Sequence, residues 1–117
     1  MVTIYSYKNC GSCKKAAKFL AEKNIKHKVV EIVENPPNKK QLKAMLETYG
    51  GNIKKLFNTS GLVYRELNLK DKLPDMSDAE CIALLSKTGK LVKRPFLMKK
   101  DQALAVGFKA DEWSEIF

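Results

Sequence analysis

A Cys-x-x-Cys motif, Cys10 to Cys13, separates a strand-like segment from a helix-like segment near the N-terminus. Residues 2–6 are mostly β-branched or aromatic and alternate in polarity, which indicates a short strand. Between the motif and about Lys23, apolar residues recur on one side of a helical pattern and charged residues lie largely on the other. These apolar residues are Ala16, Ala17, Phe19 and Leu20. Both cysteines are therefore predicted to lie where a strand turns into a helix.

This position predicts different chemistry for the two thiols. The first turn of a helix offers unpaired backbone N–H groups and the positive end of the helix dipole, and Lys8 and Lys14 add positive charge. We expect these charges to favour the thiolate of Cys10, which makes it the candidate nucleophile. Cys13 follows one helical turn later, where it can attack a mixed disulfide on Cys10. The motif thus predicts a redox dithiol with Cys13 as the resolving thiol.

Other interpretations of the motif are a zinc site and a pair of inert structural thiols. Outside the motif the chain offers only Cys81 and His27 as further zinc ligands, without a second pair at ligand spacing. Cys81 stands among residues at helical core spacing and is predicted to be a packed thiol. His27 is flanked by lysines and has no partner ligand. We therefore expect no metal and no cofactor, while inert thiols remain an alternative.

Length and composition indicate one compact domain spanning residues 1–117, with 44% hydrophobic residues to form its core. No run of about 18 apolar residues exists, and the N-terminus shows no signal-peptide pattern, so we expect a soluble cytoplasmic protein without membrane contacts. The net charge of +9 favours anionic partners. Because the lysines are scattered and not interleaved with aromatic residues, direct nucleic-acid binding is not expected.

The order of the remaining segments predicts an α/β fold. A second strand at 28–33 would run parallel to the first through a right-handed crossover. Residues 38–88 are almost entirely helical in pattern, with Asn38 as a plausible N-cap and Gly50-Gly51 as a helix stop. Strand character returns at 90–98, a hairpin brings back 103–108, and Asp111 is expected to cap a last helix at 112–117. The prediction is a mixed sheet of about four strands with a helical insertion.

Several motifs occur in the order found in one known family. They are Thr3-Ile4-Tyr5, Cys10-Gly-Ser-Cys13, Asn58-Thr59-Ser60, Tyr64-Arg65-Glu66-Leu67, Lys93-Arg94-Pro95 and Val106-Gly107-Phe108. In this combination the chain resembles the glutaredoxin-dependent arsenate reductase family, which includes the Spx-like regulators. The resemblance implies a thioredoxin-like domain with its core at 1–37 and 89–117 and the insertion at 38–88. It also implies a nucleophilic Cys10, a cis-proline at Pro95 opposite the dithiol, and an anion-binding arginine at Arg94.

The chain departs from the family pattern at two places. Ser60 stands where many members have an arginine, and no arginine follows Arg94 to complete a three-arginine oxyanion site. Arsenate reduction is therefore disfavoured. The leading hypothesis is a thiol–disulfide oxidoreductase that uses Cys10 and Cys13, with a glutaredoxin, thioredoxin or glutathione-like donor. The alternatives are an Spx-like redox-sensing regulator that binds RNA polymerase, and a true arsenate reductase.

Overall fold

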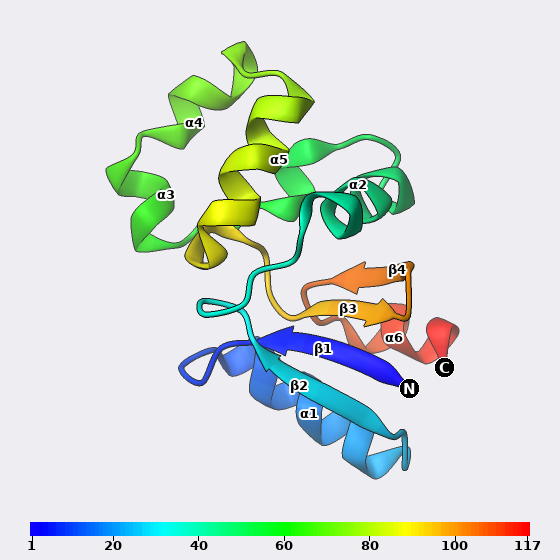
Figure 1. Ribbon diagram of the computed structural model, residues 1–117. Coiled ribbons are helices and arrows are strands. Elements are labelled where there is room, and N and C mark those ends of the chain that lie inside the picture. The colour runs from blue at the N-terminus through cyan, green and yellow to red at the C-terminus, as the bar shows by residue number, and fades with distance from the viewer.

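The computed structural model describes residues 1–117, and its centre is a four-stranded mixed sheet in the order β2-β1-β3-β4 (Figure 1). Strand β1 (Val2–Ser6) pairs in parallel with β2 (His27–Glu31) and antiparallel with β3 (Phe96–Lys99). Strand β4 (Gln102–Val106) completes a hairpin with β3. The predicted α/β fold with a thioredoxin-like mixed sheet is confirmed.

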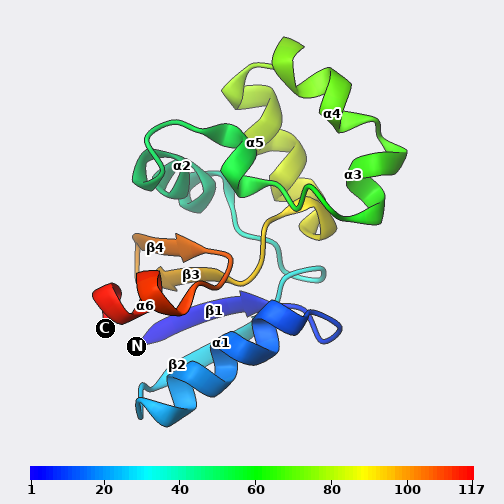
Figure 2. The same ribbon diagram turned by 180° about the vertical axis from the view of Figure 1, so that it is seen from behind.

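Two helices cover one face of the sheet, α1 (Gly11–Glu22) and α6 (Ala110–Ile116) (Figure 2). Strand side chains alternate between the faces, so every second residue of β1 contributes to the core beneath these helices. That core contains Val2, Ile4, Ala16, Leu20, Leu97, Ala105 and Trp113. Burying these side chains fixes α1 against the sheet and thereby the position of the motif at the N-terminus of α1.

The other helices lie between β2 and β3 in the chain and on the opposite side of the sheet from α1 (Figure 1). They are α2 (Lys39–Thr48), α3 (Leu62–Glu66), α4 (Leu69–Lys72) and α5 (Asp78–Lys87), with short 3₁₀ turns at Ile53–Leu56, Leu73–Asp75 and Gly89–Leu91. A second core joins these segments to Phe96, Met98 and Ala103 of the sheet. No helix is long and apolar enough to cross a membrane.

Helix caps follow the sequence signals in two cases and differ in a third. Asn38 and Ser77 each form a capping box, with Gln41 and Glu80 respectively, so the predicted cap at Asn38 is confirmed. Asp111 is not the cap of the last helix. The N–H of Trp113 donates to the carbonyl oxygen of Lys109, so the helix begins earlier and Asp111 lies in its first turn.

Three predicted strands were placed with wrong ends. The second strand ends at Glu31, because β1 ends opposite it at Ser6. The predicted strand at 90–98 reaches the sheet only from Phe96, because the N–H of Lys93 donates to the carbonyl of Leu56 instead of to a neighbouring strand. Strand β4 ends at Val106, since Gly107 adopts a φ of 70° and turns the chain away.

Candidate functional site

Cys10 is the N-cap of α1 and Cys13 lies in its first turn, as the strand-to-helix pattern predicts. The backbone N–H of Cys13 donates to the Sγ of Cys10 over 3.3 Å, so the cysteine sulfur takes the place that a serine or aspartate oxygen usually occupies at a helix start. Cys10 is half-buried, whereas Cys13 is only 4% exposed. The two thiols therefore share one helix turn but differ in access to solvent.

The environment of Cys13 keeps its thiol protonated. Burial, first, and the hydrogen bond with Cys10 raise the pKa of Cys13 from the ordinary 9.0 to about 12. The backbone of Tyr7 and the charge of Arg94 act in the opposite direction and are outweighed. Near neutral pH the thiol of Cys13 therefore stays protonated, next to the more exposed sulfur of Cys10.

Arg94 is half-buried close enough to the dithiol for its charge to act on the Cys13 sulfur. Its guanidinium lies over the ring of Tyr7, 4.7 Å from the centroid, and Nη1 donates to the carbonyl oxygen of Lys90 over 3.3 Å. No acidic side chain pairs with it. The peptide bond from Arg94 to the buried Pro95 is cis, as the family resemblance implies.

The other residues that the sequence singled out lie outside the pair formed by Cys10 and Cys13. Lys8 and Lys14 are exposed beside the motif, and Cys81 is fully buried in α5 as predicted. The Nδ1 of His27 lies 2.9 Å from the carbonyl oxygen of Ile25 at the start of β2, where it serves a local turn. Arg65, the other arginine of the chain, donates through Nη2 to the carbonyl oxygen of Ser60 over 3.2 Å.

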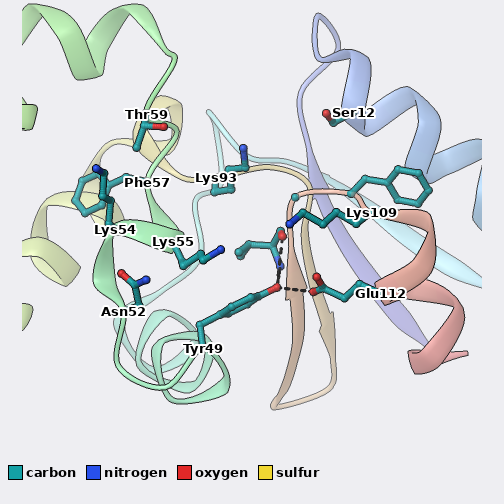
Figure 3. A pocket seen from close by; sticks show the side chains of 13 residues that line it. Ser12, Tyr49, Asn52, Lys54, Lys55, Phe57, Thr59, Lys93, Lys109 and Glu112 are labelled. Carbon is teal, nitrogen blue, oxygen red and sulfur yellow. Dashed lines mark hydrogen bonds between the residues drawn. The ribbon is translucent and has the colours of Figure 1, made fainter.

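A cavity of about 350 Å³, which we call the lysine cavity, opens beside the motif (Figure 3). Its lining combines residues of the helical segments, the β3–β4 side of the sheet and α1. They are Ser12, Tyr49, Asn52, Lys54, Lys55, Phe57, Thr59, Lys93, Val106, Gly107, Phe108, Lys109 and Glu112. Ser12 lies within the Cys-x-x-Cys motif, so the cavity extends to the helix start that carries both cysteines.

Sequence reasoning did not select the four lysines of this cavity. They come from positions 54, 55, 93 and 109, and nothing in a chain with lysines in every segment distinguishes them. The sequence shows a pair of lysines at 54–55 and a lysine directly before Arg94. It does not show that they line one cavity, because that depends on how the helical segments dock on the sheet. The sequence signals of the motif itself were stronger because they are local.

The fold and the dithiol at the start of α1 define a thioredoxin-like protein with a helical segment between β2 and β3. The ArsC family model matches residues 5–116, and the chain belongs to the ArsC family. It shares 44% sequence identity with an ArsC family related protein from Bacteroides fragilis. The crystal structure of that protein matches with a TM-score of 0.91 over 99% of this chain and 97% of that one.

Curated relatives connect the chain to both branches of the predicted resemblance. It is 47% identical to the YusI protein of Bacillus subtilis, over 97% of this chain and 96% of the relative. It is 33% identical to the global transcriptional regulator Spx of Enterococcus faecalis, over 96% and 83% of the two chains. It is 31% identical to the arsenate reductase of Rhizobium meliloti, over 83% and 68%. The chain is thus related to arsenate reductases and to Spx regulators.

Proposed function

We propose that the protein is a thiol–disulfide oxidoreductase in which Cys10 is the nucleophile and Cys13 the resolving thiol. The observation that carries this proposal is the asymmetry of the pair. Cys10 is accessible, and its Sγ accepts a hydrogen bond from the backbone N–H of Cys13 over 3.3 Å. Cys13 is buried, and the pKa of its thiol is raised to about 12. Two inert structural thiols would not require one accessible member at a helix N-terminus.

The first chemical step joins Cys10 to one half of a disulfide substrate. The thiolate of Cys10 attacks one sulfur, a new S–S bond forms, the old one breaks, and the other half leaves as a thiolate with the electron pair. The thiol of Cys10 contributes to the high pKa of Cys13, both by hydrogen bonding and by charge. In the mixed disulfide that thiol is gone, while Arg94 and the Tyr7 backbone still lower the pKa of Cys13.

In the second step Cys13 loses its proton to solvent and attacks the Sγ of Cys10. The Cys10–Cys13 disulfide forms and the bond from Cys10 to the bound half breaks. That half leaves as a thiolate, which takes a proton from solvent, and the substrate has been reduced by two electrons. A dithiol protein or two small thiols must then reduce the Cys10–Cys13 bond. This requirement agrees with a thioredoxin, glutaredoxin or glutathione-like donor as the partner.

Trapping tests the proposed roles. In a Cys13→Ser variant the resolving step is absent, so a mixed disulfide on Cys10 should persist and be detected by intact mass spectrometry. In the wild-type protein an oxidant should instead produce a Cys10–Cys13 disulfide that a reductant reverses. A bridge from Cys10 to Cys81 in the peptide map would contradict the proposal, as would the absence of any disulfide.

A regulator that binds RNA polymerase is the second candidate. The 33% identity to the Enterococcus faecalis Spx regulator favours it. The same dithiol would then act as a switch instead of turning over. Capture of RNA polymerase by the tagged protein, together with no catalytic turnover of disulfides, would support this alternative over the oxidoreductase.

Arsenate reduction is the third candidate, favoured by the 31% identity to the Rhizobium meliloti enzyme. Arginine is the side chain that offers planar, bidentate donors to an oxyanion. Arg94 acts on Cys13 through its charge, whereas Arg65 donates to the carbonyl oxygen of Ser60. We expect no arsenate-dependent oxidation of a thiol donor. A clear arsenate-dependent rate would reverse this ranking.

A further inference from the structure

The lysine cavity concentrates positive charge without matching negative charge. Four of its lining residues are lysines, and none of them forms an ion pair, because the one ion pair of the structure joins Lys18 to Glu22 on the exposed side of α1. Figure 3 shows Lys55 and Lys109 reaching toward each other from opposite sides of the cavity. Like charges held in this way repel one another and attract an anion into the space between them.

Glu112 is the single acidic residue of the cavity, and it already has a partner. Its Oε1 accepts a hydrogen bond from the hydroxyl of Tyr49 over 2.8 Å, and that hydroxyl accepts one from the N–H of Val106 over 2.9 Å (Figure 3). Burial and the nearby Glu112 help to raise the pKa of Tyr49 to about 12. The lining therefore holds four lysines and one carboxylate, which leaves the cavity positively charged, and Figure 3 shows that Lys55 and Lys109 extend furthest into it.

Backbone contacts hold the lysine-bearing segments together. The N–H of Lys93 donates to Leu56, and the N–H of Asn58 donates to Leu91, each over 2.7 Å, around an antiparallel bridge between Phe57 and Val92. These bonds fix Lys54 and Lys55 beside Lys93. The side chain of Lys93 in turn passes close to Gly107, where an added Cβ would lie 3.1 Å from the lysine Cε. Backbone hydrogen bonds thus hold the segments that carry these lysines in fixed positions.

We propose that the lysine cavity binds small thiols or disulfides that carry two or more anionic groups, and so selects the substrate that reaches Cys10. This inference rests on the proposed oxidoreductase function. The cavity volume suits a small molecule, Phe108 offers apolar contact, and the ammonium groups bind carboxylates as point charges without a fixed fork. Ser12, which lies between Cys10 and Cys13 in the chain, lines the cavity, so we place the disulfide of a molecule bound by its anionic end next to Cys10.

Binding is tested first with 3,3′-thiodipropionate, a dicarboxylate that cannot exchange disulfides. Titration of the wild-type protein, followed by amide NMR at low ionic strength, should shift the resonances of the cavity residues. A Lys55→Gln/Lys109→Gln double variant should bind about tenfold more weakly, because two exposed ion-pair partners are lost. The matched control, Lys40→Gln/Lys43→Gln, removes the same charge from exposed positions of α2 outside the cavity and should change the affinity less than about twofold.

Selection of substrate is tested with two disulfides of nearly identical shape, 3,3′-dithiodipropionate and its uncharged diamide. In a Cys13→Ser background, mixed-disulfide formation with the dicarboxylate should slow about tenfold in the Lys55→Gln/Lys109→Gln variant and much less with the diamide. The control variant should react with both as the parent does. Equal losses for both compounds, or equal losses in both double variants, would overturn the inference.

The two experiments separate this inference from the function on which it rests. If neither disulfide forms a mixed disulfide, the oxidoreductase proposal fails, whereas thiodipropionate binding still decides whether the cavity takes anions. Failure of the wild-type protein to bind thiodipropionate would overturn the inference even if Cys10 reacts with both disulfides.

Discussion

At the scale of single residues, the two motif cysteines differ in exposure and in the pKa of the buried thiol, because one caps the helix and the other lies three residues later in its first turn. Cys10 caps the helix at its surface, while Cys13 points inward and is 4% exposed. A rise in the pKa of Cys13 from 9.0 to about 12 lowers its thiolate fraction at neutral pH about a thousandfold. Reactivity should therefore concentrate at Cys10.

Limiting iodoacetamide at pH 7 should thus label Cys10 at least about tenfold faster than Cys13 or Cys81, since the thiolate is the reacting form and both other thiols are buried with raised pKa values. Peptide mapping by mass spectrometry measures the three rates. Denatured protein, in which the burial is lost, serves as the control and should label all three. Labelling of Cys13 first would reverse the assigned roles.

Arg94 belongs to the same scale, because it acts through its charge on neighbouring sulfur. Arg94→Ala should slow the reaction of Cys10 with anionic disulfides several-fold and cost about 1 kcal/mol of stability or less, since it loses only a cation–π contact with Tyr7 and a hydrogen bond to Lys90. Arg94→Lys should recover part of the rate. Denaturant unfolding and stopped-flow kinetics separate the effects, and a large loss of stability with normal kinetics would mark Arg94 as structural.

At the scale of elements, the position of the helical segment depends on close contacts with the sheet side of the molecule. Gly89 begins the 3₁₀ turn after α5 and lies directly against the backbone of Ile32 and Val33, just beyond β2. A Cβ at Gly89 would overlap the carbonyl oxygen of Ile32. The chain can bring these two segments together only with a glycine at this position.

Gly89→Ala should therefore destabilise the protein by about 2 kcal/mol or more, because backbone must move to admit the methyl group. Gly11→Ala is the matched control, since a Cβ there meets nothing within 4 Å and Gly11 lies in the first turn of α1. The control should be neutral or stabilise by up to about 1 kcal/mol. Denaturant unfolding of both variants checks this contrast, and equal stabilities would contradict the packing argument.

At the scale of the whole molecule, two thiols and two phenols that are buried or half-buried make the stability depend on alkaline pH. Burial raises the pKa values of Cys13, Tyr49, Tyr64 and Cys81 above their ordinary values. In the folded protein these groups stay protonated at a pH where the unfolded chain has lost the protons. Their contribution to stability is therefore complete at neutral pH and is lost at alkaline pH. For Cys13 and Tyr49, whose pKa values are raised to about 12, the loss continues as the pH rises toward 12.

A comparison of two proteins that differ only at position 13 isolates the contribution of Cys13. The free energy of unfolding of the wild type should fall, relative to that of Cys13→Ala, by roughly 1 kcal/mol between pH 8 and pH 10. Urea unfolding of the reduced proteins at several pH values measures the difference. A difference that stays constant over this range would show that the folded and unfolded states release the Cys13 proton together.

The sequence by itself determined the features that depend on neighbouring residues along the chain. The Cys-x-x-Cys motif at the strand-to-helix turn, the capping box at Asn38 and the helical content of residues 38–88 all follow from local periodicity and hydrogen bonding. The same local reasoning misplaced the strand at 90–98 and the cap at Asp111. Those ends depend on partners far away in the chain, such as Leu56 for Lys93.

Only the tertiary structure decided which charged residues share one space. Lys55, Lys93 and Lys109 belong to three separate segments, and they meet because the helical segments dock against the sheet near β4 and α6. Ion pairing is decided in the same way, since a count of charges does not say which of them have partners. The local sequence pattern therefore determines that both cysteines lie at the start of a helix. Long-range packing determines which lysines line the cavity next to it.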